Sequence, residues 1–244
     1  MRLPKSLANQ PLVEITFELR FNPGNQPVPE ILPGLVFASL RSKYPRSETL
    51  PLASVPADIR KQDRNLLYQA VNRLRGERVA ILVGDRVLGY SRTSPYPGWE
   101  IFKADLAEAL TVARASGFLE KVERYSLKAT NVVPGSAGEQ LGTLRLRTMI
   151  GEEKVPETGF NLRMELNDER YVRIVQVATN VNAQFGGEKP ISGVLVAVDC
   201  IRTKGAEHFW SNISAALDEI HDETKQQFFA LLTETTIERL HPTY

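Results

Sequence analysis

Cysteine and histidine are scarce in this sequence, and their scarcity excludes several kinds of site. The lone cysteine, Cys200, cannot form an internal disulfide, and its apolar neighbours predict a buried, inert thiol. No two of His208, His221 and His241 are four residues apart, and a structural zinc site needs four Cys or His ligands at characteristic spacings. We therefore expect no bound metal ion.

Long apolar runs are also missing. The longest, such as residues 79–83 and 194–198, fall far short of the roughly 20 residues that a membrane-spanning helix needs. The first ten residues lack the apolar core of a signal peptide. The sequence thus predicts a cytoplasmic protein that makes no contact with a membrane.

The motifs of common catalytic sites are absent as well. Neither GXXXXGK[ST] nor GXGXXG occurs, so no glycine-rich loop is placed to hold a phosphate. No GXSXG elbow occurs, and Cys200 beside Asp199 has no histidine near it in the sequence. Two Glu-X-Lys triplets, at 152–154 and 223–225, fall in a predicted loop and a predicted helix, whereas a metal-dependent nuclease carries this triplet on a strand. We expect no catalytic residues and no cofactor.

The sequence does contain a ten-residue alternation of apolar and polar residues at 12–21. Apolar side chains at Val13, Ile15, Phe17, Leu19 and Phe21 alternate with Glu14, Thr16, Glu18 and Arg20. This period of two predicts a strand with one buried and one polar face. Glu14 and Arg20 share the polar face but lie three pleats apart, so each must meet a neighbouring strand or a partner. The polar row is most simply a cross-strand charge ladder, and a functional surface is the second interpretation.

The same order of elements is predicted twice along the chain. In residues 1–118 the first strand is followed by a helix at 30–43, β-rich runs at 65–74 and 78–92, and a helix at 99–117. In residues 119–244 a strand at 122–133 is followed by a short helix at 138–150, strands near 159–168, 170–179 and 193–203, and a helix at 207–240. We predict an α+β fold of two similar halves, 1–118 and 119–244, each an antiparallel sheet packed on a long helix. This order resembles the helix-grip and TATA-binding-protein-like arrangements.

Charge is distributed unevenly along the chain. Residues 41–92 hold 11 Lys/Arg against 5 Asp/Glu, a balance of +6, whereas residues 205–244 hold 2 against 7, a balance of −5. Such opposite charges indicate internal complementarity, oligomer formation or two partner surfaces. The strand arginines that could form a nucleic-acid-binding face are Arg73, Arg75, Arg78, Arg163 and Arg173. Because the same strands carry acidic residues, an ordinary sheet surface is the favoured interpretation.

The predicted C-terminal helix is the longest element. A helix of about 33 residues is about 50 Å long, which is longer than the strands of its own sheet. Part of the apolar stripe of this helix is therefore expected to extend beyond the sheet. We predict that Phe228, Leu231 and Leu232 dock on a partner protein or a second subunit. The acidic residues expected to meet the basic region at 41–92 are Asp218, Asp222 and Glu223. The alternative is a kink near His221 that folds the helix back over the core.

Four segments together resemble a sporadically distributed bacterial family of proteins of about this length without an established activity. They are NQPLVEITFELRF, PYPGWEIF, LKATN and LDEIHDETKQQFFALLTETTIERLHP, and the resemblance covers nearly the whole chain. The corresponding positions here are Pro11, Glu14, Arg20, Phe21, Trp99, Asn131, Asp218, His221, Phe228 and Thr233. One segment departs, because Lys128-Ala129-Thr130-Asn131 stands where family members have Arg-Tyr-Ile-Asn. The resemblance implies an accessory role near defence or toxin-type systems and no particular chemistry.

The sequence therefore predicts a non-enzymatic binding or regulatory protein of a bacterial accessory system, with antiviral defence as one setting, that acts through protein–protein contacts. The candidate binding residues are Glu14, Arg20, Asn131, Asp218, His221, Phe228 and Leu231. The first alternative is a nucleic-acid-binding module that uses the arginine-bearing sheet face. The second is a metal-dependent nuclease that uses Glu14, Glu18, Asp199 or His221.

Overall fold

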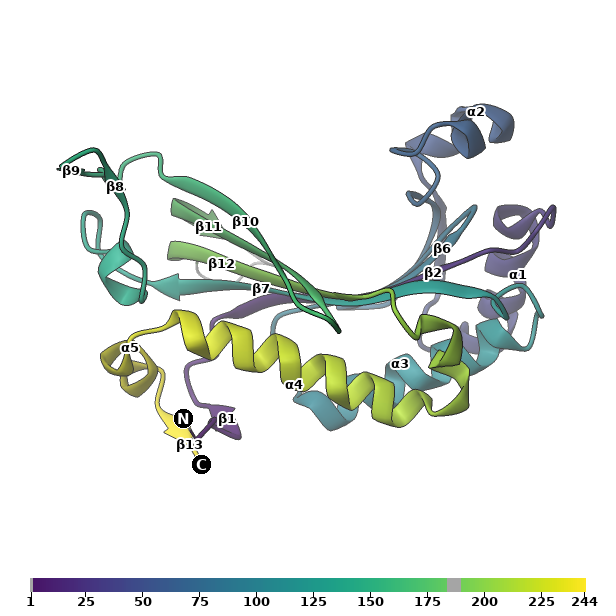
Figure 1. Ribbon diagram of the computed structural model, residues 1–244. Helices are drawn as coiled ribbons and strands as arrows, with labels where there is room; N and C mark the ends of the chain where they lie inside the picture. The colour runs from purple at the N-terminus through teal and green to yellow at the C-terminus, as the bar shows by residue number, and fades with distance from the viewer. Residues whose placement is uncertain (1, 184–189) are drawn as a thin grey trace.

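One continuous antiparallel sheet of nine strands organises the molecule in the computed structural model, which describes residues 2–183 and 190–244 (Figure 1). The strand order is β10-β11-β12-β7-β2-β6-β5-β4-β3. Every neighbouring pair is antiparallel. The predicted α+β class, with a large antiparallel sheet and several helices, is therefore confirmed.

The first part of the chain builds the half of the sheet from β2 to β3. Its elements are β1 (Ser6–Leu7), β2 (Leu12–Phe21), α1 (Val28–Leu40), β3 (Arg46–Thr49), η1 (Pro51–Ser54), α2 (Ala57–Gln62), β4 (Ala70–Arg75), β5 (Val79–Gly84), β6 (Val87–Thr93) and α3 (Trp99–Arg114). The apolar run predicted at 78–92 folds into two strands, β5 and β6, because Asp85 and Arg86 form a turn within it. The β4–β5 hairpin predicted around Gly76 and Glu77 is present.

The second part builds the half from β7 to β10. Its elements are β7 (Val122–Pro134), η2 (Leu141–Thr143), β8 (Met149–Ile150), β9 (Glu153–Lys154), β10 (Asn161–Asn167), β11 (Val172–Ala183), β12 (Ile191–Arg202), η3 (Ala206–Ser211), α4 (Ile213–Leu231), α5 (Glu234–Arg239) and β13 (Pro242–Thr243). The helix predicted at 138–150 is wrong, since this stretch holds only the single turn η2 before β8. The short strands β1 and β13 pair and bring the two ends of the chain together.

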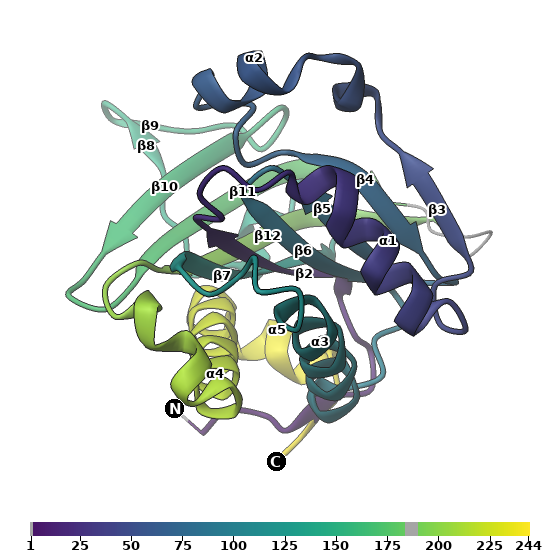
Figure 2. The same cartoon turned by 90° about the vertical axis from the view of Figure 1, so that its right-hand side faces the viewer.

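The helices α1, α3 and α4 cover one face of the sheet (Figure 2). The apolar side chains of β2 point into this covered face, where Phe17, Leu19 and Phe21 are completely buried. The sheet curves away from these helices, and α2 and the β8–β9 hairpin stand at opposite ends of the other face (Figure 1). Among the described helices, none combines the length and apolar character needed to cross a membrane.

The single long helix predicted at 207–240 is wrong. The stretch is divided into η3, α4 and α5, and it breaks at polar capping residues. The Asn212 side chain accepts a hydrogen bond from the Ala215 N–H at 3.2 Å, and the Thr233 hydroxyl accepts one from the Thr236 N–H at 3.3 Å. Such caps start new helices because they satisfy N–H groups that lack a partner in the first turn. The kink considered near His221 is absent, because α4 continues through this residue.

Candidate binding surface

The sheet face turned away from α1, α3 and α4, called the open face below, carries the polar row of β2. Glu14, Thr16, Glu18 and Arg20 are each half-buried, whereas their apolar neighbours on the same strand are buried. The strand β2 lies between β6 and β7 at the centre of the sheet. The row that the sequence predicted therefore forms the middle of the open face.

Each charged residue of the row meets a close neighbour, as the spacing of Glu14 and Arg20 required. Glu14 accepts a hydrogen bond from the Ser91 hydroxyl on β6 at 2.6 Å. Glu18 accepts from Arg20 Nε at 2.7 Å and from Arg124 Nη2 of β7 at 3.3 Å. The row is thus bonded to both neighbouring strands, which supports the charge-ladder interpretation and does not test a binding role.

Beside this row lie two desolvated charged groups that the sequence interpretation did not connect. Arg124 of β7 and Asp199 of β12 both project onto the open face, as their register with β2 shows. Burial lowers the pKa of Arg124 and raises the pKa of Asp199. Among the described residues, Arg124 Nε and Asp199 Oδ1 have no hydrogen-bond partner. The centre of the open face therefore holds polar atoms that the chain's own described groups leave unsatisfied.

An aromatic side chain extends this centre toward β4. The Arg20 guanidinium lies over the Tyr68 ring, 4.3 Å from its centroid, and the Tyr68 hydroxyl donates to Glu123 at 3.3 Å. A guanidinium held over an aromatic face retains its outward N–H donors. Arg20 is thus held in place by Glu18 and Tyr68 together.

The wall of the open face at the α2 end is fixed by a buried ion pair. Arg60 of α2 donates from Nε and Nη2 to the Asp85 carboxylate in the β5–β6 turn, at 2.7 and 3.2 Å. Both side chains are almost completely buried, and hydrogen bonding to Asp85 raises the pKa of Arg60. A two-point bond of this kind fixes orientation as well as distance, so α2 is held rigidly at this wall.

The five arginines proposed for nucleic acid do not share one surface. Arg73, Arg75 and Arg163 point to the open face, as the cross-strand register shows. Arg173 points to the covered face, where it pairs with Glu223 of α4, and Arg78 donates to the Ser94 carbonyl. On the open face, Arg73 and Arg75 both approach Glu48.

Two of the C-terminal candidates meet on the other side of the sheet, between α3 and α4. The carboxylate of Asp218 accepts hydrogen bonds from Trp99 Nε1 at 2.8 Å and from Lys103 Nζ at 2.5 Å. The His221 ring stacks on the Trp99 indole, with centroids 4.0 Å apart and planes 10° apart. The cluster joins three residues that the bacterial resemblance singled out, Trp99, Asp218 and His221, and the sequence interpretation missed Lys103.

The His221 imidazole is uncharged at neutral pH, because burial lowers its pKa to about 4. Its Nδ1 atom lies 3.4 Å from the Asp222 carboxylate, too weak a contact to offset the loss of water. The contact with Trp99 is therefore a stack of two neutral rings that holds the helices together.

The remaining sequence candidates are part of the core. Asn131 is buried and donates to the Val196 carbonyl of β12 at 3.3 Å. Phe228 and Leu232 are buried in the chain's own core, and Leu231 packs against it. The predicted docking stripe is thus occupied within the chain. Its acidic companions Asp218 and Glu223 pair with Lys103 and Arg173, outside the region 41–92.

The four residues considered for a nuclease do not lie on one face of the sheet. His221 lies on the covered face, whereas Glu14, Glu18 and Asp199 lie on the open face. Within residues 2–183 and 190–244, no group of three or more His, Cys, Asp or Glu side chains is placed to hold a metal ion. Cys200 is buried and its thiol pKa is raised to about 12, mainly by burial, so it stays protonated.

The chain matches no family model and no curated protein sequence.

Proposed function

We propose that this chain is a non-catalytic binding protein and that a protein partner binds to its open face. The observation that carries the proposal is a curved, polar sheet face that the described helices leave largely uncovered, with partly exposed charged side chains at its centre. A partner would contact the exposed parts of Glu18, Arg20 and Arg124, whose side chains each remain about a quarter exposed.

The charges of the open face favour a protein over a nucleic acid. Basic and acidic side chains alternate across it, with Glu18 between Arg20 and Arg124, and Glu48 beside Arg73 and Arg75. A phosphate backbone needs clustered positive charge, and each of these carboxylates would repel it. A protein surface that offers both signs of charge can match such a pattern.

The proposal includes a two-halved architecture and an accessory role in bacteria. The strands that begin the two predicted halves, β2 and β7, are neighbours, and each is also paired with the strand that precedes a long helix, β6 or β12. This order supports two similar halves that share one sheet. The accessory role rests on the bacterial resemblance alone.

Affinity capture from a bacterial host tests the binding role. The double variant Thr16→Arg, Lys128→Glu alters the centre of the open face at positions that carry no core contact. We expect it to lose a protein that the wild type retains. The matched control Ile101→Lys changes an exposed residue of α3 on the covered side and should retain that protein.

A nucleic-acid role is tested in parallel by fluorescence anisotropy with DNA and RNA at about 50 mM salt, where phosphate contacts contribute strongly. Binding that falls steeply with salt and is abolished by the double variant would replace the protein-binding proposal. Retention of every captured protein by the double variant would also contradict it.

A further inference from the structure

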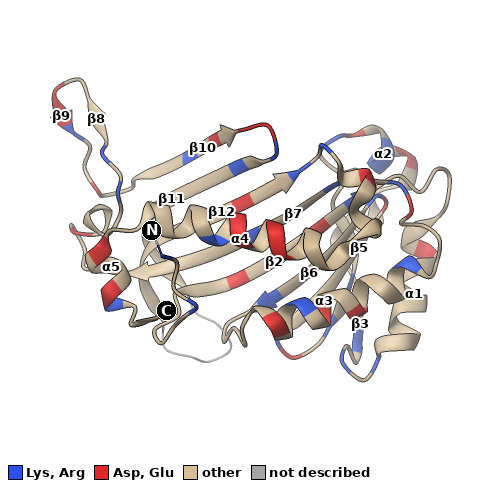
Figure 3. Ribbon diagram, turned by 60° about the horizontal axis from the view of Figure 1, so that its bottom comes forward, with Lys and Arg blue, Asp and Glu red and all other residues tan. Residues whose placement is uncertain are grey.

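The strand β10 forms one margin of the sheet, and its outer edge has hydrogen-bonding groups to offer (Figure 3). The Thr179 N–H donates to the Phe160 carbonyl, and the Asp168 N–H donates to the Tyr171 carbonyl, so even-numbered residues of β10 bond to β11. Antiparallel strands alternate, and the odd-numbered residues therefore direct their N–H and C=O groups outward. These residues are Asn161, Arg163, Glu165 and Asn167.

The sequence of β10, NLRMELN, is complementary to itself in the antiparallel direction. If a second copy pairs in the register that places Met164 opposite Met164, each Arg163 meets Glu165 and each Leu162 meets Leu166. Asn161 then meets Asn167. The opposite charges coincide with the outward-directed residues, so each Arg163–Glu165 pair would also exchange two backbone hydrogen bonds.

We propose that this chain forms a symmetric dimer through β10, with the two sheets continuous across the contact. The pairing is isologous, since the same seven residues serve both partners. Self-complementary charge selects a second copy over an unrelated strand, because a strand of arbitrary sequence would not place an acid opposite Arg163 and a base opposite Glu165.

The side chains of β10 are available for this contact. Arg163 and Glu165 are exposed and form no ion pair with any described residue. Leu166 is 38 % exposed, although it lies on the apolar side of the strand. The dimer register places Leu166 of the second copy against Leu162, which lines a groove of about 670 Å³ together with Phe160 and Ile150. Ile150, at 73 % exposure, is the most exposed large apolar residue described.

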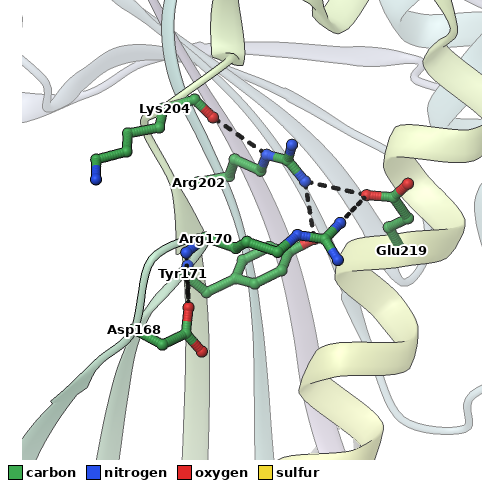
Figure 4. A network of polar contacts seen from close by, with 6 residues as sticks. All are labelled: Asp168, Arg170, Tyr171, Arg202, Lys204 and Glu219. Carbon is green, nitrogen blue, oxygen red and sulfur yellow. Dashed lines mark hydrogen bonds and ion pairs between the residues drawn. The ribbon is translucent and has the colours of Figure 1, made fainter.

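Contacts at the turn between β10 and β11 fix the position of this edge (Figure 4). Arg170 and Arg202 both donate to Glu219 of α4 at 3.0 Å. Asp168 accepts hydrogen bonds from the N–H groups of Arg170 and Tyr171, which closes the β10–β11 turn. A strand fixed in this way loses little conformational entropy when it pairs, which favours association.

The opposite margin of the sheet is less suited to strand pairing. Strand β3 has only four residues, and Pro51 follows it after a single intervening residue. Short edge strands and nearby prolines are common protections against strand pairing. The contrast indicates that the chain protects one edge and presents the other.

Charge exchange tests the dimer by light scattering coupled to size-exclusion chromatography and by sedimentation velocity. The wild type is expected to have the mass of two chains at micromolar concentrations. In Glu165→Arg, the new arginine of each copy faces Arg163 of the other copy, so the dimer contains two pairs of like charges. The dissociation constant should rise at least about tenfold. The double variant Arg163→Glu, Glu165→Arg restores opposite charges and should restore the dimer. Circular dichroism confirms that each variant is folded.

Cysteine cross-linking tests the register in a Cys200→Ser background. Residues opposite each other at a non-hydrogen-bonded antiparallel position have Cα atoms about 4.5 Å apart, within reach of a disulfide. Met164→Cys should therefore form a covalent dimer under mild oxidation. Leu162→Cys is the matched control and should not, because its counterpart is Leu166. A monomeric wild type, or equal cross-linking of the two cysteine variants, would overturn the proposal.

Discussion

On β2 the side chains that face the helices are buried, whereas those on the other side of the same strand are half-exposed and polar. The covered face is packed with aromatic rings, and Phe17, Tyr125 and Phe209 form a cluster in which each ring contacts the other two. The open face instead brings together charged groups such as Glu18, Arg20 and Arg124. The difference indicates that one face supplies stability while the other is free to carry recognition.

The largest expected effect comes from shortening a side chain on the covered face. Phe17→Ala removes a completely buried ring and should lower the free energy of unfolding by about 3–5 kcal/mol. Thr16→Ala, one residue away on the open face, should change it by less than about 1 kcal/mol. Urea denaturation followed by circular dichroism measures both. Equal losses would contradict the division of roles between the two faces.

A second prediction concerns pH and the cluster between α3 and α4. The folded-state pKa of His221 is about 4, below the ordinary value of 6.5, because the ring is buried. The unfolded chain therefore binds a proton more readily between these values, and stability falls as the pH decreases from 6.5 toward 4. The expected loss for this one group is about 3 kcal/mol.

The groups facing His221 are Asp218 and Asp222 on its own helix, Lys225 one turn further on, and the Trp99 ring of α3. His221→Gln should remove the part of the acid sensitivity that this imidazole causes. His208→Gln is the matched control, because His208 is exposed and should leave the profile unchanged. Urea unfolding at pH 7 and at pH 4.5 compares the three proteins. An identical pH profile in wild type and His221→Gln would contradict the assignment.

A smaller loss of stability is expected when a hydrogen bond between two residues of the open face is removed. Ser91 is buried and donates to Glu14, so Ser91→Ala should cost about 1 kcal/mol of unfolding free energy. Ser39→Ala is a suitable control, because Ser39 is exposed and its hydroxyl donates to the Leu35 carbonyl of its own helix. No difference between the two variants would show that the Glu14 contact contributes nothing to stability.

The alternation of apolar and polar residues is enough to predict the two faces of β2, and the same parity rule applies to the arginine-bearing strands. Arg173 shares its parity with Val175 and Val177, both buried, so its place on the covered face could have been predicted from the sequence. Arg73 is adjacent to the buried Leu74 and accordingly points the other way.

Cross-strand neighbours could not be predicted in this way. The placement of Arg124 and Asp199 on one face depends on β7 pairing with both β2 and β12, and the sequence alone does not reveal that register. The predicted length of the C-terminal helix is too great because its apolar period continues through Asn212 and Thr233, whose side chains each cap the start of a new helix. Local capping overrides the periodicity there.

The smallest expected effect concerns Asp199, and it tests whether the buried charge of this residue on the open face lowers the free energy of unfolding. Burial raises the folded-state pKa of Asp199, while Arg124 and Lys128 oppose the shift. The folded chain therefore holds this proton more tightly than the unfolded chain, and stability decreases as the pH rises from the ordinary value of 3.8 through the raised pKa.

Asp199→Asn keeps the shape of the side chain and removes the buried charge, while Arg124 retains its contact with Glu18. We expect a small gain in unfolding free energy at pH 7, and no gain below pH 3.8, where the wild-type carboxyl is also protonated. Urea unfolding at both pH values measures this difference. If the open face binds a partner through Asp199, the more stable variant should bind it more weakly, because the variant lacks the negative charge. A variant that is less stable at pH 7 would show instead that Asp199 helps hold the sheet together, as the residues of the covered face do.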